Sequence, residues 1–186
     1  KNSKGYSPDW IQYVKNSISD IAPDYTMSRM LKDYETRFYG KLSKRSAHLG
    51  ANHFEVAKKI AAWKEEVASH WDNFQVESFT CDQDFTTGGP VVGKDYEFNL
   101  VIDRHELQGM LGVDMVVVDE DPVSHTQDFI RATPFTLKKE EGSKLYFNLH
   151  ITPSETGEHK IGFRVHPENK ELPHRMDFAY VRWIQL

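Results

Sequence analysis

The sequence has very little cysteine and no long apolar run, and each absence excludes a class of protein. Cys81 is the single cysteine among 186 residues, so an internal disulfide cannot form. A lone thiol suits a reducing compartment, and we expect a cytoplasmic protein. No apolar stretch approaches the roughly 20 residues that a membrane-spanning helix requires, so we predict no membrane partner.

Excess positive charge is also missing. Residues 1–73 hold 12 basic and 9 acidic side chains, whereas residues 74–186 hold 11 and 19. The basic side chains of the first part are interspersed with acids and adjoin only at Lys44-Arg45 and Lys58-Lys59. This pattern favours a solvated helix surface, so we predict no nucleic-acid partner.

The ends of the sequence also lack features of a complete chain. It starts at Lys1 without an initiator methionine and closes on an apolar stretch from Tyr180 to Leu186. We therefore expect a piece of a larger protein, with the chemistry upstream of Lys1.

Apolar residues at helical spacing predict about three helices in residues 1–73. Ser7 and Pro8 suit the start of the first helix, and Pro23 ends it. Thr26 is a candidate cap for the second, and Gly40 is a candidate stop. The third runs from about residue 54 to residue 71. Its predicted buried face comprises Ala57, Ile60, Ala61, Val67, Ala68 and Trp71.

Beyond residue 73 the hydrophobic period changes from 3.6 to 2, which is typical of strands. The predicted strands span residues 74–81, 96–102, 113–118, 135–138, 145–152, 158–166 and 178–186. About seven short strands favour an antiparallel, immunoglobulin-like β-sandwich. The predicted fold is therefore α+β, with a helical segment (1–73) packed on a sandwich domain (74–186).

Nine histidines raise the question of a metal site, but none forms a recognisable ligand pair. His159, His166 and His174 are spread over two predicted elements. A hairpin between 145–152 and 158–166 would place His150 opposite Lys160, a cation that opposes metal binding. We predict surface histidines and no metal site.

Other candidate chemistry is weaker still. The run Asp119-Glu120-Asp121 matches no known calcium loop and favours a solvated turn over a calcium site. Gly88-Gly89-Pro90 lies between strands, so it predicts a turn rather than a phosphate cradle. Ser69-His70 and Ser124-His125 lack a third partner, and Cys81 has no neighbouring base, so we expect a buried thiol. We predict no catalytic and no cofactor-binding residue in this chain.

Aromatic side chains offer the remaining binding chemistry. An exposed aromatic ring on a sandwich face can stack on a sugar ring, and four residues are candidates: Tyr96, Tyr146, Tyr180 and Trp183. Alternation places Val181 and Trp183 on one face. We favour the interpretation that Trp183 packs between the sandwich and the helices.

Several stretches resemble the bacterial α-glucan (glycogen) phosphorylase family. In the helices these are SPDWIQYVKNSI at 7–18, PDYTMSRMLKDY at 23–34, and the helix from Ala57 to Trp71. In the last strands they are GFRVHP at 162–167 and VRW at 181–183. The resemblance covers about half of the chain and both of its ends.

The resemblance implies a glycosyltransferase of carbohydrate metabolism that converts α-1,4-glucan and phosphate to glucose 1-phosphate. Its pyridoxal phosphate and its catalytic residues would all precede Lys1, so no catalytic residue is carried over. The closing helices of such a body would brace upstream domains of the same chain. The residues expected to do so are Trp10, Met27, Met30 and Tyr34.

Our interpretation at this stage is a non-catalytic C-terminal part of an α-glucan phosphorylase, a structural or interaction appendage without activity in isolation. One alternative is a glucan-binding module, which predicts exposed coplanar aromatic rings. The other is an independent interaction domain, which predicts a large apolar patch on the helices.

Overall fold

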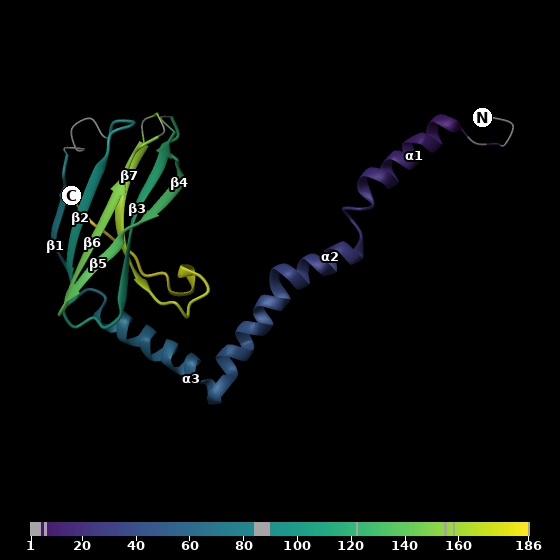
Figure 1. The fold of residues 1–186 in the computed structure, drawn as a ribbon. Coiled ribbons are helices and arrows are strands. Elements are labelled where there is room, and N and C mark those ends of the chain that lie inside the picture. Colours follow the sequence, from purple (N-terminus) through teal and green to yellow (C-terminus); the bar gives the residue numbers. More distant parts are fainter. Residues whose placement is uncertain are drawn as a thin grey trace. The chain divides into compact units, whose positions relative to one another are not determined.

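The computed structural model describes residues 5, 7–83, 90–121, 123–154, 156–157 and 159–185. The glycines at 88 and 89 and the last residue of the predicted final strand lie outside the described residues. The chain divides into two units, residues 1–58 and 59–186, and each is described by itself. Figure 1 shows helices in the first unit and two layers of strands in the second.

The helices come first along the chain and the strands follow, which makes the fold α+β. The helical elements are α1 (Pro8–Ile21), α2 (Met27–Tyr34), the π-helical turn η1 (Glu35–Tyr39), α3 (Gly40–His70) and the 3₁₀ turn η2 (Arg175–Phe178). The strands are β1 (Gln75–Cys81), β2 (Tyr96–Asp103), β3 (Met110–Glu120), β4 (Gln127–Pro134), β5 (Thr136–Glu141), β6 (Lys144–Ile151), β7 (His159–Glu168) and β8 (Arg182–Trp183).

The predicted starts of the first two helices are confirmed, but the predicted stop is wrong. Pro8 is the first residue of α1, and the Thr26 hydroxyl accepts a hydrogen bond from the Arg29 backbone N–H at 3.3 Å. Gly40 instead has helical dihedrals, and its N–H bonds to the Glu35 carbonyl in the π-helical turn. A Cβ at residue 40 would lie 3.1 Å from that carbonyl oxygen, so glycine accommodates the π turn rather than ending the helix.

The helix is instead interrupted at residues 51–54, so three helices with the expected boundaries are not observed. Ala51 is extended, and Asn52, His53 and Phe54 have φ values of 50°, 56° and 64°. Left-handed backbone costs roughly 1–2 kcal/mol for each residue other than glycine, so this break is strained.

The last turns of α3 pack on the sandwich within the second unit. Val67 and Trp71 are buried there, as predicted, and Trp63 packs against the same core. The Trp71 ring lies 5.2 Å from Phe74 and 5.5 Å from Tyr180. Ala61 and Ala68 are exposed, contrary to the prediction, because the buried stripe follows 63, 67 and 71 at i, i+4 spacing.

The sandwich consists of two four-stranded antiparallel sheets. The strand order is β1-β2-β6-β5 in the first sheet (sheet A) and β4-β3-β7-β8 in the second (sheet B). Alternate side chains of both sheets meet in one core. There the centre of the Phe163 ring lies 4.7, 5.4 and 6.0 Å from the ring centres of Phe79, Phe98 and Phe135. Burial of these large side chains is the main stabilising contribution.

Two predictions about the strands are wrong. The described residues form eight strands rather than seven, because β4 pairs with β3 along the edge of sheet B. Strands β6 and β7 do not form a hairpin, since they lie in different sheets. His150 therefore faces Glu97, and Lys160 faces Val118.

Candidate functional site

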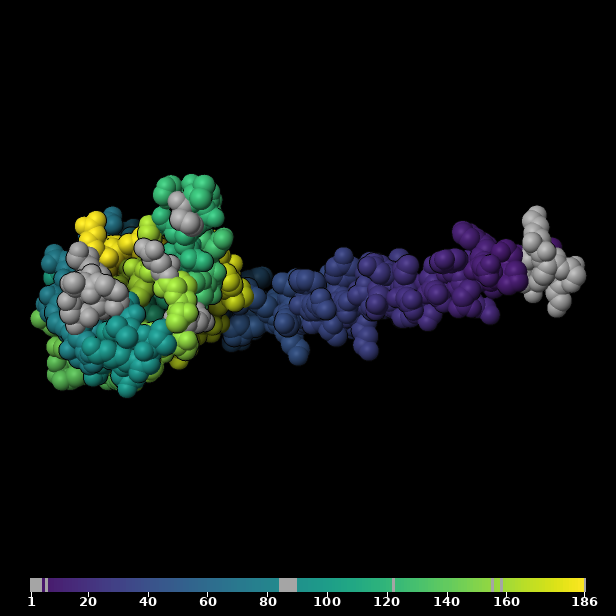
Figure 2. Space-filling model, turned by 90° about the horizontal axis from the view of Figure 1, so that it is seen from above, coloured from purple at the N-terminus to yellow at the C-terminus, as the bar shows by residue number. Residues whose placement is uncertain are grey.

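The helices of the first unit carry large apolar side chains that the described residues of that unit leave exposed. We define the helical apolar face as the set Trp10, Val14, Ile18, Ile21, Met27, Leu31, Tyr34 and Phe38, all of which are exposed. Trp10 is 66% exposed, and among the described residues of the first unit none is buried. Figure 2 shows these helices as the purple and blue part of the chain. Helices this amphipathic normally bury their apolar side against a partner.

Aromatic residues gather where α2 passes into the π-helical turn. The Tyr34 ring stacks on Tyr39 at 6.0 Å and lies 6.1 Å from Phe38. The π turn shifts the helical phase by one residue, which brings positions 38 and 39 to the same side as position 34. Of the four expected contact residues, Trp10, Met27 and Tyr34 are exposed and Met30 is half-buried.

The outer face of sheet B carries the second candidate surface, built around Trp183. Trp183 lies opposite Arg164 in the β7–β8 ladder, so both side chains point away from the core. The indole ring rests on Gly162, where an added Cβ would lie 2.9 Å from Cζ3. Trp183 is 53% exposed, so the prediction that it packs between sandwich and helices is wrong. Alternation correctly placed Val181 on the same side, but that side faces solvent.

An open groove of about 290 Å³ lies beside this ring, and we call it the Trp183 groove. Its lining residues are Val116, Val118, Gln127, Lys160, Ile161, Gly162 and Trp183. Lys160 and Gln127 form the polar rim of this groove. The Glu120 carboxylate orients both side chains, because it accepts hydrogen bonds from Lys160 and from the Gln127 amide, the latter at 3.0 Å. These bonds and His125 lower the pKa of Glu120 to about 2, so the rim carries a fixed ion pair at neutral pH.

A buried carboxylate lies on the same face of sheet B. Asp114 of β3 is 1% exposed, and its Oδ2 accepts hydrogen bonds from Arg164 Nε at 3.1 Å and Nη2 at 2.9 Å. Arg175 also donates to this oxygen, and His166 Nε2 lies 3.5 Å away. Burial alone would raise the pKa of Asp114, but the bonds from His166, Arg175 and Arg164 outweigh it, and the pKa lies well below its usual range.

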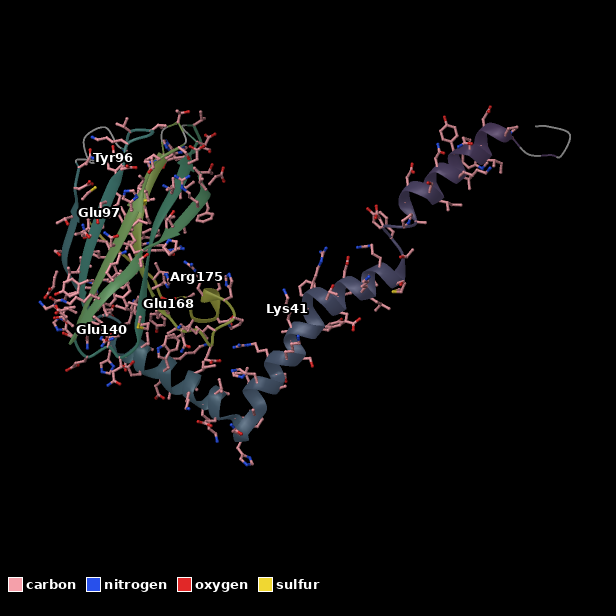
Figure 3. All side chains as sticks on the ribbon, viewed as in Figure 1. Lys41, Tyr96, Glu97, Glu140, Glu168 and Arg175 are labelled. Carbon is pink, nitrogen blue, oxygen red and sulfur yellow. The ribbon has the colours of Figure 1, made fainter. Side chains whose placement is uncertain are left out.

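We call Asp114, Arg164, His166 and Arg175 the Asp114 cluster, and its contacts have a structural role. Arg175 belongs to the segment after β7, which is drawn in yellow in Figure 1. Figure 3 labels Arg175 on this segment and Glu168 at the end of β7. The cluster therefore ties that segment to sheet B. This cluster was not predicted from the sequence, although a lone acid inside the apolar run 113–118 is the signal that could have revealed it.

The other predicted sugar-stacking residues lie apart from Trp183. Tyr96 is buried, and its hydroxyl accepts a hydrogen bond from the Val91 backbone N–H at 2.8 Å. Tyr146 is half-buried on sheet A beneath Lys139, and Tyr180 packs against Trp71. The structure brings none of these rings together with Trp183 on a single flat platform.

The serine–histidine pairs do not have the geometry of a catalytic triad. Ser69 Oγ lies 3.0 Å from His70 Nδ1, and Glu66 Oε1 lies 3.2 Å from the same nitrogen. A triad requires serine and acid on opposite ring nitrogens. His125 Nδ1 instead faces Glu120 at 3.3 Å.

The thiol and the acidic run have local structural roles. Cys81 is half-buried at the end of β1, and burial first, then the nearby Asp82 carboxylate, raises the pKa of its thiol. Such a thiol is a poor nucleophile at neutral pH. Asp121 accepts hydrogen bonds from the backbone N–H groups of Val123 and Ser124 at 2.9 and 2.7 Å, which stabilises a turn.

Within the described part of the chain, no three histidine, cysteine or acidic side chains gather as a metal site would require. His166 contacts Asp114, and His174 caps η2 by accepting from the Met176 N–H at 3.1 Å. None of the described helices combines the length and apolar character needed to cross a bilayer.

Comparison with known proteins identifies the family. A family model described as the glycogen phosphorylase C-terminal domain matches residues 71–185, which is more than half of the chain. The chain belongs to this family. No solved structure matches it. The matched range begins directly after α3, which ends at His70, and includes all eight described strands of the sandwich.

Three phosphorylases are among the curated proteins that this chain is similar to. Maltodextrin phosphorylase of Thermococcus litoralis is 35% identical over 68 residues, which is 37% of this chain and 8% of that protein. Glycogen phosphorylase of Mycobacterium tuberculosis is 21% identical over 132 residues, 67% of this chain and 15% of that protein. Glycogen phosphorylase of Aquifex aeolicus is 39% identical over 44 residues, 24% and 6% respectively. The chain spans less than a fifth of the length of these relatives.

Proposed function

We propose that this chain is the non-catalytic C-terminal part of an α-glucan phosphorylase, and that its helices brace a catalytic body contributed by the rest of that enzyme. The observation that carries the proposal is the helical apolar face, which is exposed throughout the first unit. Membership of the phosphorylase family and the small share of its relatives that the chain spans support it.

The occupant of the helical apolar face is, in this proposal, the catalytic body rather than an unrelated protein. Helices without buried residues gain little stability from their own hydrogen bonds, and most helical stability in proteins comes from packing. A partner that is part of the same polypeptide is always present at high effective concentration, which favours a permanent brace. Residues 1–73 would then close the catalytic body, and residues 74–186 would form a separate sandwich domain.

The described residues do not fit pyridoxal phosphate. That cofactor needs a lysine for its Schiff base inside a protected pocket, with a partner for its ring nitrogen. Every described lysine is exposed or half-buried. We therefore place the cofactor and the phosphorolysis of α-1,4-glucan to glucose 1-phosphate in the catalytic body, in the cytoplasm, which the lone Cys81 suits.

We also infer an immunoglobulin-like topology for the sandwich. The strand orders β1-β2-β6-β5 and β4-β3-β7-β8 support it, because they match the ABED and CFG sheets with one additional strand beside the third. The additional strand is β4, which explains why eight strands replace the expected seven.

Phosphorolysis assays test the proposed division of labour. We expect no glucose 1-phosphate from this chain alone with maltoheptaose, phosphate and added pyridoxal phosphate. We expect the catalytic body alone to lose activity faster on heating than the same body with this chain added. Glucose 1-phosphate formation by this chain alone, or identical inactivation rates with and without it, would refute the proposal.

A further inference from the structure

The Trp183 ring lies close to the backbone of a glycine in sheet B. Gly162 lies beneath the ring, and a Cβ there would approach Cζ3 to 2.9 Å and Cε3 to 3.3 Å. A side chain at 162 would therefore require the indole to shift from its present position. The ring is therefore positioned with one side supported and 53% of the residue open to solvent.

The surroundings of the ring combine an apolar floor with a polar rim. Val116 and Val118 form the floor of the Trp183 groove, while Gln127 and Lys160 stand at its rim. Glu120 orients both rim side chains by hydrogen bonds. A lysine ammonium has three N–H donors and a glutamine amide has both donors and an acceptor, so both keep capacity for a ligand.

Trp183 also lines a second groove. Its volume is about 550 Å³, and it lies where β1 and β8 approach each other. The residues lining it are Gln75, Val76, Arg182, Trp183, Ile184 and Gln185. Trp183 therefore lines two grooves that both carry polar side chains, and together they could hold a chain-like ligand longer than one ring.

We propose that the two grooves at Trp183 bind a segment of α-1,4-glucan, with one glucosyl ring stacked on the indole. A pyranose ring has an apolar face of C–H groups and a rim of hydroxyls, which match the ring, the valine floor and the polar rim. The choice of α-1,4-glucan over another oligosaccharide rests on the proposed function. The site is separate from catalysis and serves to hold polymer near the enzyme.

Indole resonances in nuclear magnetic resonance spectra test the proposal directly. The chain has four tryptophans, so its spectrum contains four indole N–H signals, and Trp183→Phe assigns one of them. With maltoheptaose we expect a saturable shift of the Trp183 signal alone. Cellohexaose, a β-1,4-glucan, should cause a much smaller shift. No shift with either sugar at millimolar concentration would overturn the proposal.

Two variants test the separate contributions of the indole ring and of the glycine next to it. Trp183→Ala should weaken maltoheptaose binding by about tenfold or more, the effect of losing one aromatic stacking contact. Gly162→Ala keeps the indole but displaces it, and should also weaken binding severalfold. Trp10→Ala is the control, since Trp10 is 66% exposed but lies in the first unit, and this variant should bind maltoheptaose like the unchanged chain.

The outcomes distinguish this proposal from the brace. Binding that survives Trp183→Ala, in a variant whose amide spectrum stays dispersed, would place the sugar elsewhere. A shift of the Trp183 signal on addition of the catalytic body, with none on addition of sugar, would show that the grooves form a protein interface. In that case the glucan site fails while the brace stands.

Discussion

Asp114→Ala lowers the free energy of unfolding of the second unit by about 3–5 kcal/mol, the cost of removing one partner of a buried ionic cluster. Asp114 is 1% exposed, and its carboxylate binds Arg164 and Arg175. Without it, two guanidinium groups lose their common acceptor, and the segment that carries Arg175 loses its tie to β3. The loss of unfolding free energy can be measured by urea unfolding, with near-ultraviolet circular dichroism as the readout.

The matched control is Asp128→Ala, because Asp128 is exposed on β4 of the same sheet. Its unfolding free energy should stay within about 0.5 kcal/mol of the unchanged chain. Equal effects of the two substitutions would show that the Asp114 cluster does not stabilise the sandwich.

The same cluster makes stability depend on acid. The pKa of Asp114 is depressed in the folded chain from 3.8, so its contribution is fully present above that pH and is lost as pH falls below it. We expect the free energy of unfolding to decrease as the pH is lowered below about 4. This decrease should be less steep in Asp114→Asn. An unchanged slope in that variant would assign the acid sensitivity to other carboxylates.

Ile18→Asp with Leu31→Asp weakens association of this chain with the catalytic body by about 100-fold or more, because each charge would be buried in the interface. Both residues belong to the helical apolar face, on α1 and α2. We expect the loss in biolayer interferometry with the catalytic body immobilised. Helix formation alone should change little, since both positions are exposed in the first unit.

The control is Asn16→Asp with Ser19→Asp, which adds the same charge to the polar side of α1. Asn16 accepts a hydrogen bond from Gln12 at 2.8 Å, which marks that side as solvated. Affinity should change less than threefold, as rim charges typically contribute about 1 kcal/mol or less. Similar losses in both double variants would mean that charge, and not the apolar face, controls association.

Much of the sandwich follows from local sequence. The period-2 stretches predicted β2, β6 and β7 because each buries one face, and the apolar run at 113–118 predicted the central strand β3. Strand β4 was not predicted, because apolar and polar residues do not alternate along Gln127–Pro134. It is an edge strand with a bulge opposite Val117 and Val118, so little of it is buried.

The candidate surfaces on sheet B could not be predicted from the hydrophobic pattern of the sequence, because they depend on contacts between strands. Alternation shows which residues share a side of β8, but not which side faces solvent, so Trp183 was assigned to the wrong one. The glycine next to the Trp183 ring, Gly162, belongs to a neighbouring strand, and the Asp114 cluster joins residues up to 61 positions apart. The helical apolar face, by contrast, was predictable from spacing, since it uses residues of single helices.

Hydrogen exchange of residues 8–50 tests the central claim most directly, with the chain measured alone and with the catalytic body added. Alone, their amides should exchange nearly as fast as in unfolded chain, whereas those of β2 and β3 are protected, because protection follows burial. With the catalytic body present, we expect exchange in 8–50 to slow at least about tenfold, with β2 and β3 unchanged. Exchange in 8–50 that stays fast in the assembled enzyme would contradict the brace.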